Sequence, residues 1–237
     1  MNHFELFKLK KAGLTNLNIL AILEYHEKQK KSLSLRDMAV VSKCRNPVLL
    51  FYQGNLDLLQ RRKLAVVGAR NASAVGTKSV QKIIKELGNR FVIVSGLARG
   101  IDTSAHVSVL KNGGATIAVI GCGLDVYYPK ENQQLQDYLG KNHLVLSEYA
   151  PGEKPLKYHF PERNRIIAGL SQGVLVAEAK ARSGSLITCE RALEEGRDVF
   201  AIPGNILDGQ SDGCHKLINE GAKCVTSGQD ILSEYRD

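Results

Sequence analysis

The sequence predicts an α/β protein whose extended Rossmann-type sheet is doubly wound and mostly parallel. Short apolar runs recur along the chain, and each leads into a turn of small residues, as at residues 64–67, 91–95 and 117–120. Runs of this length and composition are typical of parallel strands that helices cover on both faces. Amphipathic stretches separate the runs, and this alternation favours a parallel sheet with right-handed crossovers.

This pattern assigns the elements in order along the chain. Strands are predicted near residues 64–67, 91–95, 115–120, 144–148, 173–178, 198–202 and 223–226. Helices are predicted near residues 77–87, 103–112, 130–139, 161–171, 184–195 and 212–220. In the first helix, apolar residues recur at helical spacing from Val80 to Leu87, and Gly88 suits the position after a helix end. Pro161 suits the first turn of a helix, where no backbone N–H is needed.

Residues 1–46 are predicted to form a small helical module, separate from a domain that spans residues 47–237. Two amphipathic stretches lie around Leu20 and Met38, with a run of basic residues between them. Pro47 ends this pattern, because proline disfavours helix at the residue before it. A unit of about 40 residues forms a marginal core alone, so we expect the module to dock on another surface.

The composition is that of a soluble protein with an ordinary core, since 43% of the 237 residues are hydrophobic. No apolar stretch approaches the roughly 18 residues of a membrane span, and the first residues lack the apolar region of a secretory signal. The five cysteines form no CxxC pair, which is typical of reduced thiols in a cytosolic protein. We therefore expect a cytoplasmic protein that does not associate with membranes.

The net charge of +8 is unevenly distributed along the chain. Residues 1–46 hold nine Lys and Arg residues against four Asp and Glu residues, whereas residues 47–237 hold 23 against 20. A basic balance is compatible with nucleic acid as a partner. In the main domain, however, the excess is small, so the placement of individual charges has to carry that argument.

Small residues follow the predicted strands and indicate a ligand site at the carboxyl edge of the sheet. Gly68 and Arg70 follow the first strand, and Ser95 and Gly96 end the second. Ligands of open α/β sheets bind outside these strand ends, where glycine allows close approach and a basic residue suggests a phosphate-bearing ligand. The glycines can equally serve only to make tight turns. Because no GxGxxG or GxxxxGK[ST] motif is present, the sequence signals a dinucleotide or nucleotide site only weakly, and we assign no cofactor.

The segment 151–165 holds the densest group of basic and aromatic residues. Lys157, Phe160 and Arg163 lie in a predicted loop and in the helix after it. This combination suits single-stranded nucleic acid, because Lys and Arg meet phosphates while aromatic rings stack on bases. The alternative is a solvated loop in which Phe160 packs inward and Arg163 pairs with a carboxylate. The residues alone leave both interpretations open.

Catalytic and metal-binding motifs are not found. The chain contains no HExxH, no GxSxG elbow, and no Cys and His spacing suited to zinc. Residues 183–185 begin another predicted helix, where hydroxyl and N–H groups can hold a phosphate or simply cap the helix. The sequence therefore favours binding over catalysis.

Motifs that occur in order within residues 48–226 resemble those of the DNA-processing protein A family (DprA, also called Smf), and the chain looks similar to streptococcal members. They are GAR at 68–70, SGLARGID at 95–102, GCGLD at 121–125, SEY at 147–149, FPERNRIIAGLS at 160–171, SGSLIT at 183–188 and GRDVFAIPG at 196–204. The resemblance implies an extended Rossmann domain, often preceded by a SAM-like helical domain. Here residues 44–47 run straight into the main domain without the longer connection usual in the family, so we expect a truncated or fused helical module.

The resemblance also implies a binding and loading protein rather than an enzyme. Such proteins bind incoming single-stranded DNA in natural transformation, protect it, and load the RecA recombinase onto it, commonly as homodimers through the Rossmann domain. The resemblance assigns DNA-contacting roles to the basic residues Arg70, Lys130, Lys157 and Arg197. It assigns a stacking role to Phe160, and pocket-shaping roles to Gly68, Ser95, Gly96, Gly123, Arg163, Asn164 and Ser185.

A nucleotide-processing enzyme is the alternative from a different class. The segment 183–190 has a strand–turn–helix context comparable to that of the PGGxGTxxE motif in Rossmann phosphoribohydrolases. It keeps small residues and Glu190, but it lacks the paired glycines and the GT step. DNA binding is therefore the preferred interpretation.

Overall fold

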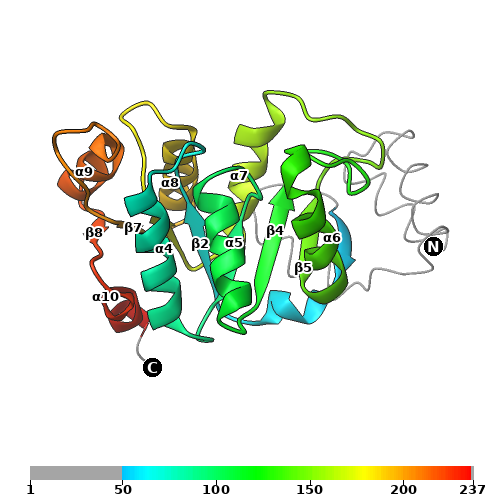
Figure 1. The fold of residues 1–237 in the computed structure, drawn as a ribbon, viewed down its shortest axis with the longest axis horizontal. Helices are drawn as coiled ribbons and strands as arrows, with labels where there is room; N and C mark the ends of the chain where they lie inside the picture. Colours follow the sequence, from blue (N-terminus) through cyan, green and yellow to red (C-terminus); the bar gives the residue numbers. More distant parts are fainter. Residues whose placement is uncertain (1–49, 236–237) are drawn as a thin grey trace.

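A computed structural model describes residues 50–235, which form one eight-stranded sheet with helices on both faces (Figure 1). The strands are β1 (Phe51–Gly54), β2 (Lys63–Val67), β3 (Val92–Ser95), β4 (Thr116–Ile120), β5 (Leu144–Ser147), β6 (Gly173–Val176), β7 (Asp198–Ala201) and β8 (Lys223–Cys224). The α-helices are α4 (Ala74–Leu87), α5 (Ile101–Lys111), α6 (Gln133–Asn142), α7 (His159–Leu170), α8 (Gly184–Glu194), α9 (Asp212–Asn219) and α10 (Gly228–Leu232). Short 3-10 helices are η1 (Leu56–Gln60), η2 (Lys130–Asn132) and η3 (Ser233–Tyr235).

The predicted fold class, a doubly wound and mostly parallel α/β sheet, is confirmed. The strand order is β1-β5-β4-β3-β2-β6-β7-β8, and every neighbouring pair is parallel except β1 with β5. The antiparallel edge strand β1 and the helix α10 were not predicted, and α6 begins three residues late because η2 forms first. The predicted helical module at 1–46 lies outside the described residues.

The two faces of the sheet carry separate apolar cores. Alternate residues of β2 point to opposite faces, as the period of a strand requires. Leu64 and Val66 pack with residues of α4, α5 and α10, whereas Ala65 and Val67 pack with residues of α7, α8 and α9. Helix α6 covers the first of these faces further along the sheet, over β4 and β5 (Figure 1). No helix among residues 50–235 is long and apolar enough to cross a membrane.

The sheet order reverses at β2, which neighbours both β3 and β6. After β2 the chain crosses to β3 through α4 on one face, and after β6 it crosses to β7 through α8 on the other face. The two connections therefore part in opposite directions at the carboxyl ends of adjacent strands. In open α/β sheets this arrangement leaves a crevice that serves as the binding site.

Close backbone contacts hold the turn after β2 in place. The Ala69 N–H donates to the Glu178 carbonyl (2.7 Å), and the Ile101 N–H donates to the Ala69 carbonyl (3.1 Å). The buried Glu178 carboxylate accepts from both the backbone N–H and the hydroxyl of Ser73, the residue that caps α4. Gly100 has a positive φ of 73°, and a Cβ there would overlap the Ala69 carbonyl oxygen.

We predict that Gly100→Ala lowers the free energy of unfolding by about 3 kcal/mol, because alanine disfavours the positive φ of this position and its Cβ has no room there. Gly113→Ala is the matched control. Gly113 has a similar φ of 68°, but a Cβ at this position would meet no atom within 4 Å, so we expect a loss of about 1 kcal/mol. Urea denaturation of both variants measures the difference. Equal losses would show that the contact with Ala69 does not constrain this turn.

Candidate nucleic-acid interface

A pocket of about 690 Å³ opens at the point where the sheet order reverses. Most of its lining comes from three parts of the chain: the turn after β2, the segment after β6 that leads into α8, and α7 with the loop before it. Ala98, Asp102 and Tyr128 complete the lining. The carboxyl ends of the parallel strands point to the top of Figure 1, where these segments meet. The pocket thus lies where the turns of small residues predicted a ligand site.

Exposed cations from all three segments line the pocket. They are Arg70, Lys157, Lys180 and Arg182. Among residues 50–235, none of the four has an ion-pair partner in the structure, so their charges face solvent unneutralised. Asp102 is the single carboxylate among the lining residues, and it is largely buried. A concave surface of this charge attracts anions and focuses the field on them.

Phe160 supplies an aromatic ring to the pocket. It is half-buried, and its ring centroid lies 5.3 Å from that of the exposed Tyr128. The Arg70 guanidinium carbon lies 5.1 Å from the Phe160 ring centroid, within the range of a cation–π contact. Phe160 therefore does not pack into a core. Its ring contacts Arg70 of the turn after β2 on one hand and Tyr128 on the other.

Arg163 lies beneath this surface and is 4% exposed. Its Nη1 donates to the Gly96 carbonyl (2.6 Å) and to the Val119 carbonyl. Burial lowers the pKa of Arg163, and the nearby Asp102 carboxylate opposes that shift. Arg163 thus acts as an internal tie between α7 and the ends of β3 and β4, and its head group is held away from solvent.

The small residues of the turns make room for these contacts. A Cβ at Gly96 would overlap the Arg163 guanidinium, and a Cβ at Gly68 would lie 2.7 Å from the Ile101 side chain. The Ser95 hydroxyl donates to the Val66 carbonyl of the neighbouring strand (2.7 Å). The Asp102 carboxylate accepts from the Gly96 N–H (3.1 Å) and the Ala98 N–H (3.4 Å). Ser95 and Gly96 therefore support the pocket from below without lining it.

The pocket brings together most of the residues that the resemblance assigned. Gly68, Arg70, Lys157, Phe160, Arg163, Asn164 and Ser185 all line it. Gly123 lies instead against the turn 150–152, where a Cβ would come within 2.9 Å of the Gly152 nitrogen. Lys130 is exposed at the start of η2, two residues beyond Tyr128, and does not line the pocket.

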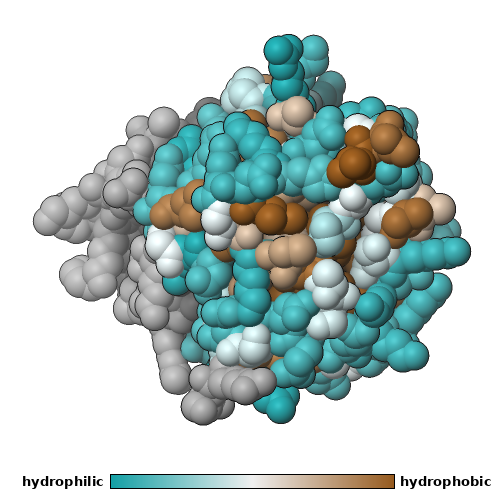
Figure 2. Space-filling view, turned by 90° about the vertical axis from the view of Figure 1, so that its left-hand side faces the viewer, coloured by the Kyte–Doolittle hydropathy of each residue, from teal (hydrophilic) through white to brown (hydrophobic). Residues whose placement is uncertain are grey.

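Arg197 lies outside the pocket. It precedes β7, so it sits at the amino end of a parallel strand, whereas the pocket lies at the carboxyl ends. There it lines a separate hollow of about 360 Å³ together with Leu193, Leu217 and Lys223. Figure 2 shows the side of the molecule that carries α9 and β8, with apolar side chains gathered across its middle. The structure therefore does not group Arg197 with Arg70 and Lys157.

Two pocket-lining cations, Lys180 and Arg182, were not among the predicted site residues. They follow the carboxyl end of β6, and this position shortly after a predicted strand could have identified them from the sequence. Beside them, Ser183 caps α8 and shares a hydroxyl–hydroxyl hydrogen bond with Ser185 (2.6 Å). The first N–H groups of α8 thus open on the basic wall, where a helix N-terminus favours an anion. No group of three or more His, Cys, Asp or Glu residues within 50–235 is suited to a metal ion.

Comparison with known proteins decides the family. The model of the family described as "DNA recombination-mediator protein A" matches residues 26–236. The chain belongs to this family. It is similar to the DNA processing protein DprA of Streptococcus pneumoniae, with 58% identity over 278 residues that cover 99% of each chain. Because this alignment is longer than the 237 residues of the present chain, the relative holds residues that this chain lacks.

Solved structures of the family share the fold. The X-ray structure of the Streptococcus pneumoniae protein aligns with a TM-score of 0.82 and covers all of this chain and 99% of that one. DNA processing protein A of Helicobacter pylori, described for its single-stranded DNA binding mode, aligns with a TM-score of 0.75 at 28% identity. That match covers 86% of this chain and 93% of the other. The recombination-mediator fold is therefore shared across widely diverged sequences.

We predict that Arg163→Met lowers the free energy of unfolding by about 3 kcal/mol, since methionine roughly keeps the volume but removes the donor to the two carbonyl groups and the cation beside the buried Asp102 carboxylate. Arg70→Met is the control. Arg70 is exposed, so we expect a change within about 0.5 kcal/mol. Chemical denaturation monitored by circular dichroism measures both. A loss below about 1 kcal/mol for Arg163→Met would contradict the role of an internal tie.

Proposed function

We propose that this protein binds single-stranded DNA in the pocket at the carboxyl ends of β2 and β6. The observation that carries this proposal is the convergence of four exposed cations and the aromatic rings of Phe160 and Tyr128 on a single concave surface. Cations meet the phosphates of a flexible strand, and the ring offers a stacking face to a base. The Helicobacter pylori relative, described for its single-stranded DNA binding, supports the same assignment here.

A single strand suits this pocket better than a duplex does. The Phe160 ring lies inside a hollow beside Arg70 and Tyr128, and only an unpaired base can leave its stack to reach it. The basic wall of Lys180, Arg182 and the α8 N-terminus then holds the phosphate. Because these contacts do not read base edges, sequence preference is expected to be slight.

We further propose that the bound strand is delivered to the RecA recombinase during natural transformation, without a chemical step on the DNA. The description of the family as recombination mediators supports this role. A homodimer through the Rossmann domain is part of the same proposal, and the apolar side chains beside α9 and β8 offer a surface for it (Figure 2). An assay of RecA strand exchange, with sedimentation of the free protein, tests both parts.

Arg70→Ala and Lys157→Ala are each expected to weaken binding of a labelled single-stranded oligonucleotide about tenfold, since each removes a charge that faces a phosphate. Each change should also reduce the slope of log K against log salt by about 0.7. Fluorescence anisotropy at several salt concentrations measures both quantities.

Lys111→Ala is the matched control for lost charge, because Lys111 is exposed at the far end of α5. Arg197→Ala tests whether the DNA path extends beyond the pocket, and we expect it to keep the salt slope of the parent. If neither pocket variant changes the slope, the assignment of the pocket is wrong. Hydrolysis of nucleotides by the parent protein would favour the enzyme alternative instead.

Phe160→Leu is expected to weaken binding by about 1–3 kcal/mol if one base stacks on the ring, whereas Phe160→Tyr keeps a stacking face and should bind like the parent. The same anisotropy assay measures the affinities, and thermal denaturation reports on the fold. An unchanged affinity together with a lowered melting temperature would return Phe160 to a packing role.

A further inference from the structure

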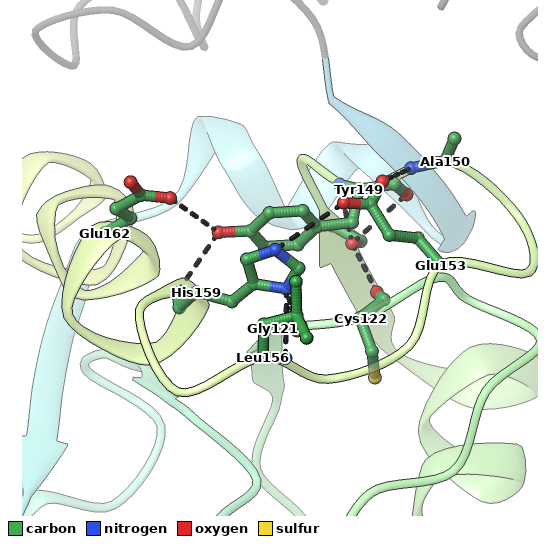
Figure 3. A network of polar contacts seen from close by, with 9 residues as sticks. Gly121, Cys122, Tyr149, Ala150, Glu153, Leu156, His159 and Glu162 are labelled. Carbon is green, nitrogen blue, oxygen red and sulfur yellow. Dashed lines mark hydrogen bonds and ion pairs between the residues drawn. The ribbon is translucent and has the colours of Figure 1, made fainter.

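The segment between β5 and α7 carries Lys157 to the pocket although residues 150–158 form neither helix nor strand. A lysine on such a loop contributes to binding only if the loop is held in place, because ordering it on binding costs conformational entropy. The polar network of Figure 3 lies under this loop and centres on His159, the first residue of α7. His159 is 1% exposed, and nothing in the proposed binding uses its ring directly.

The His159 ring is fixed from several sides. It stacks on the Tyr149 ring, with centroids 3.8 Å apart and 21° between the planes. Its Nδ1 lies 3.1 Å from the carbonyl oxygen of Gly121, the residue directly after β4. The Leu156 N–H lies 3.4 Å from the same nitrogen, and we take the shorter contact with Gly121 as the hydrogen bond. The Tyr149 hydroxyl lies 3.2 Å from both the His159 carbonyl oxygen and the Glu162 carboxylate.

The other ring nitrogen faces the loop itself. His159 Nε2 lies 3.5 Å from Oε1 of Glu153, and the second carboxylate oxygen of Glu153 accepts from the Ala150 N–H (3.3 Å). The Glu153 carbonyl also accepts from the Gly123 N–H (2.9 Å). Both ring nitrogens thus meet acceptors, one on the edge of the sheet and one on the loop. The ring bridges these two structures (Figure 3).

The position of His159 in the sequence connects this bridge to the pocket. Lys157 lies two residues before it and Phe160 directly after it, and both line the pocket while His159 points away into the network. The backbone that presents the cation and the aromatic ring is therefore fixed at the residue between them. We propose that His159 is a positioning residue for DNA binding, which holds the 150–158 loop so that Lys157 and Phe160 face the strand. This inference rests on the proposed function.

A double-mutant cycle tests the coupling. We expect His159→Ala to weaken binding of a single-stranded oligonucleotide about tenfold, and to weaken it clearly less when Lys157→Ala is already present, because only the positioning of Phe160 is then left to lose. Arg182→Ala is the comparison, because Arg182 lines the pocket from the segment after β6. There the losses should multiply, since sites that share no contacts act independently. Equal, fully multiplying losses in both cycles would overturn the proposal.

Conservative variants separate positioning from a general loss of packing. The amide nitrogen of Asn can replace Nδ1 as donor to Gly121, so His159→Asn should recover most of the affinity that His159→Ala loses. His159→Gln places its amide nearer the position of Nε2 and should recover less. If His159→Ala fails to fold, the cycle is measured with His159→Gln. Equal affinities of the Asn, Gln and Ala variants would contradict a bond through Nδ1.

The freedom of the loop can be measured without DNA. Trypsin cleaves after Lys157 but not after Lys154, which Pro155 follows. Mass spectrometry of the fragment that begins at Tyr158 should show cleavage about tenfold faster in His159→Ala than in the parent, because local opening controls cutting. An unchanged rate would overturn the proposal. If Lys157→Ala itself leaves DNA affinity unchanged while the loop opens, it is the proposed function that has failed, and the positioning role of His159 in the loop remains.

Discussion

The pocket depends on the hydrogen bonds that the buried guanidinium of Arg163 donates. Removing a cation from water is costly, and here two strand-end carbonyl groups and the neighbouring Asp102 carboxylate offset that cost. The arrangement requires glycine at position 96, because a Cβ would occupy the place of the guanidinium. The space that the Arg163 guanidinium needs therefore explains why small residues lie beneath a pocket whose exposed lining is basic.

The helical period of α7 places residues that contact the sheet on one side of the helix and residues that line the pocket on another. His159 and Arg163 lie four residues apart, so they occupy one side of the helix, and both contact carbonyl groups at or just beyond the end of β4. Phe160, Asn164 and Ile167 follow the same spacing on the side that lines the pocket. Fixing the side that carries His159 and Arg163 thus sets the direction in which Phe160 and Asn164 face the pocket.

Much of this site could be predicted from the sequence, since parallel strands bring their carboxyl ends to one edge. Arg70 and Lys157 meet there as expected. The burial of Arg163 was also encoded, because it lies three and four residues before the buried Ile166 and Ile167. Arg197 precedes a strand, which places it at the opposite edge of the sheet; the strand predicted at 198–202 already implied this position, whereas the family motif does not. The antiparallel β1 could not be predicted, because its pairing with β5 depends on residues about 90 positions away.

The contacts of the Phe160 ring have a consequence for how the pocket fills. The ring already has two partners, with the Arg70 guanidinium and the Tyr128 ring against it. A base that takes its place on the ring must displace one of these neighbours. If the protein binds DNA as proposed, the ring exchanges one stacking partner for another, and a displaced Arg70 becomes free to contact a phosphate. Under the proposed function, the net gain on binding is smaller than the contacts in the complex suggest, because the ring gives up a contact that it already makes.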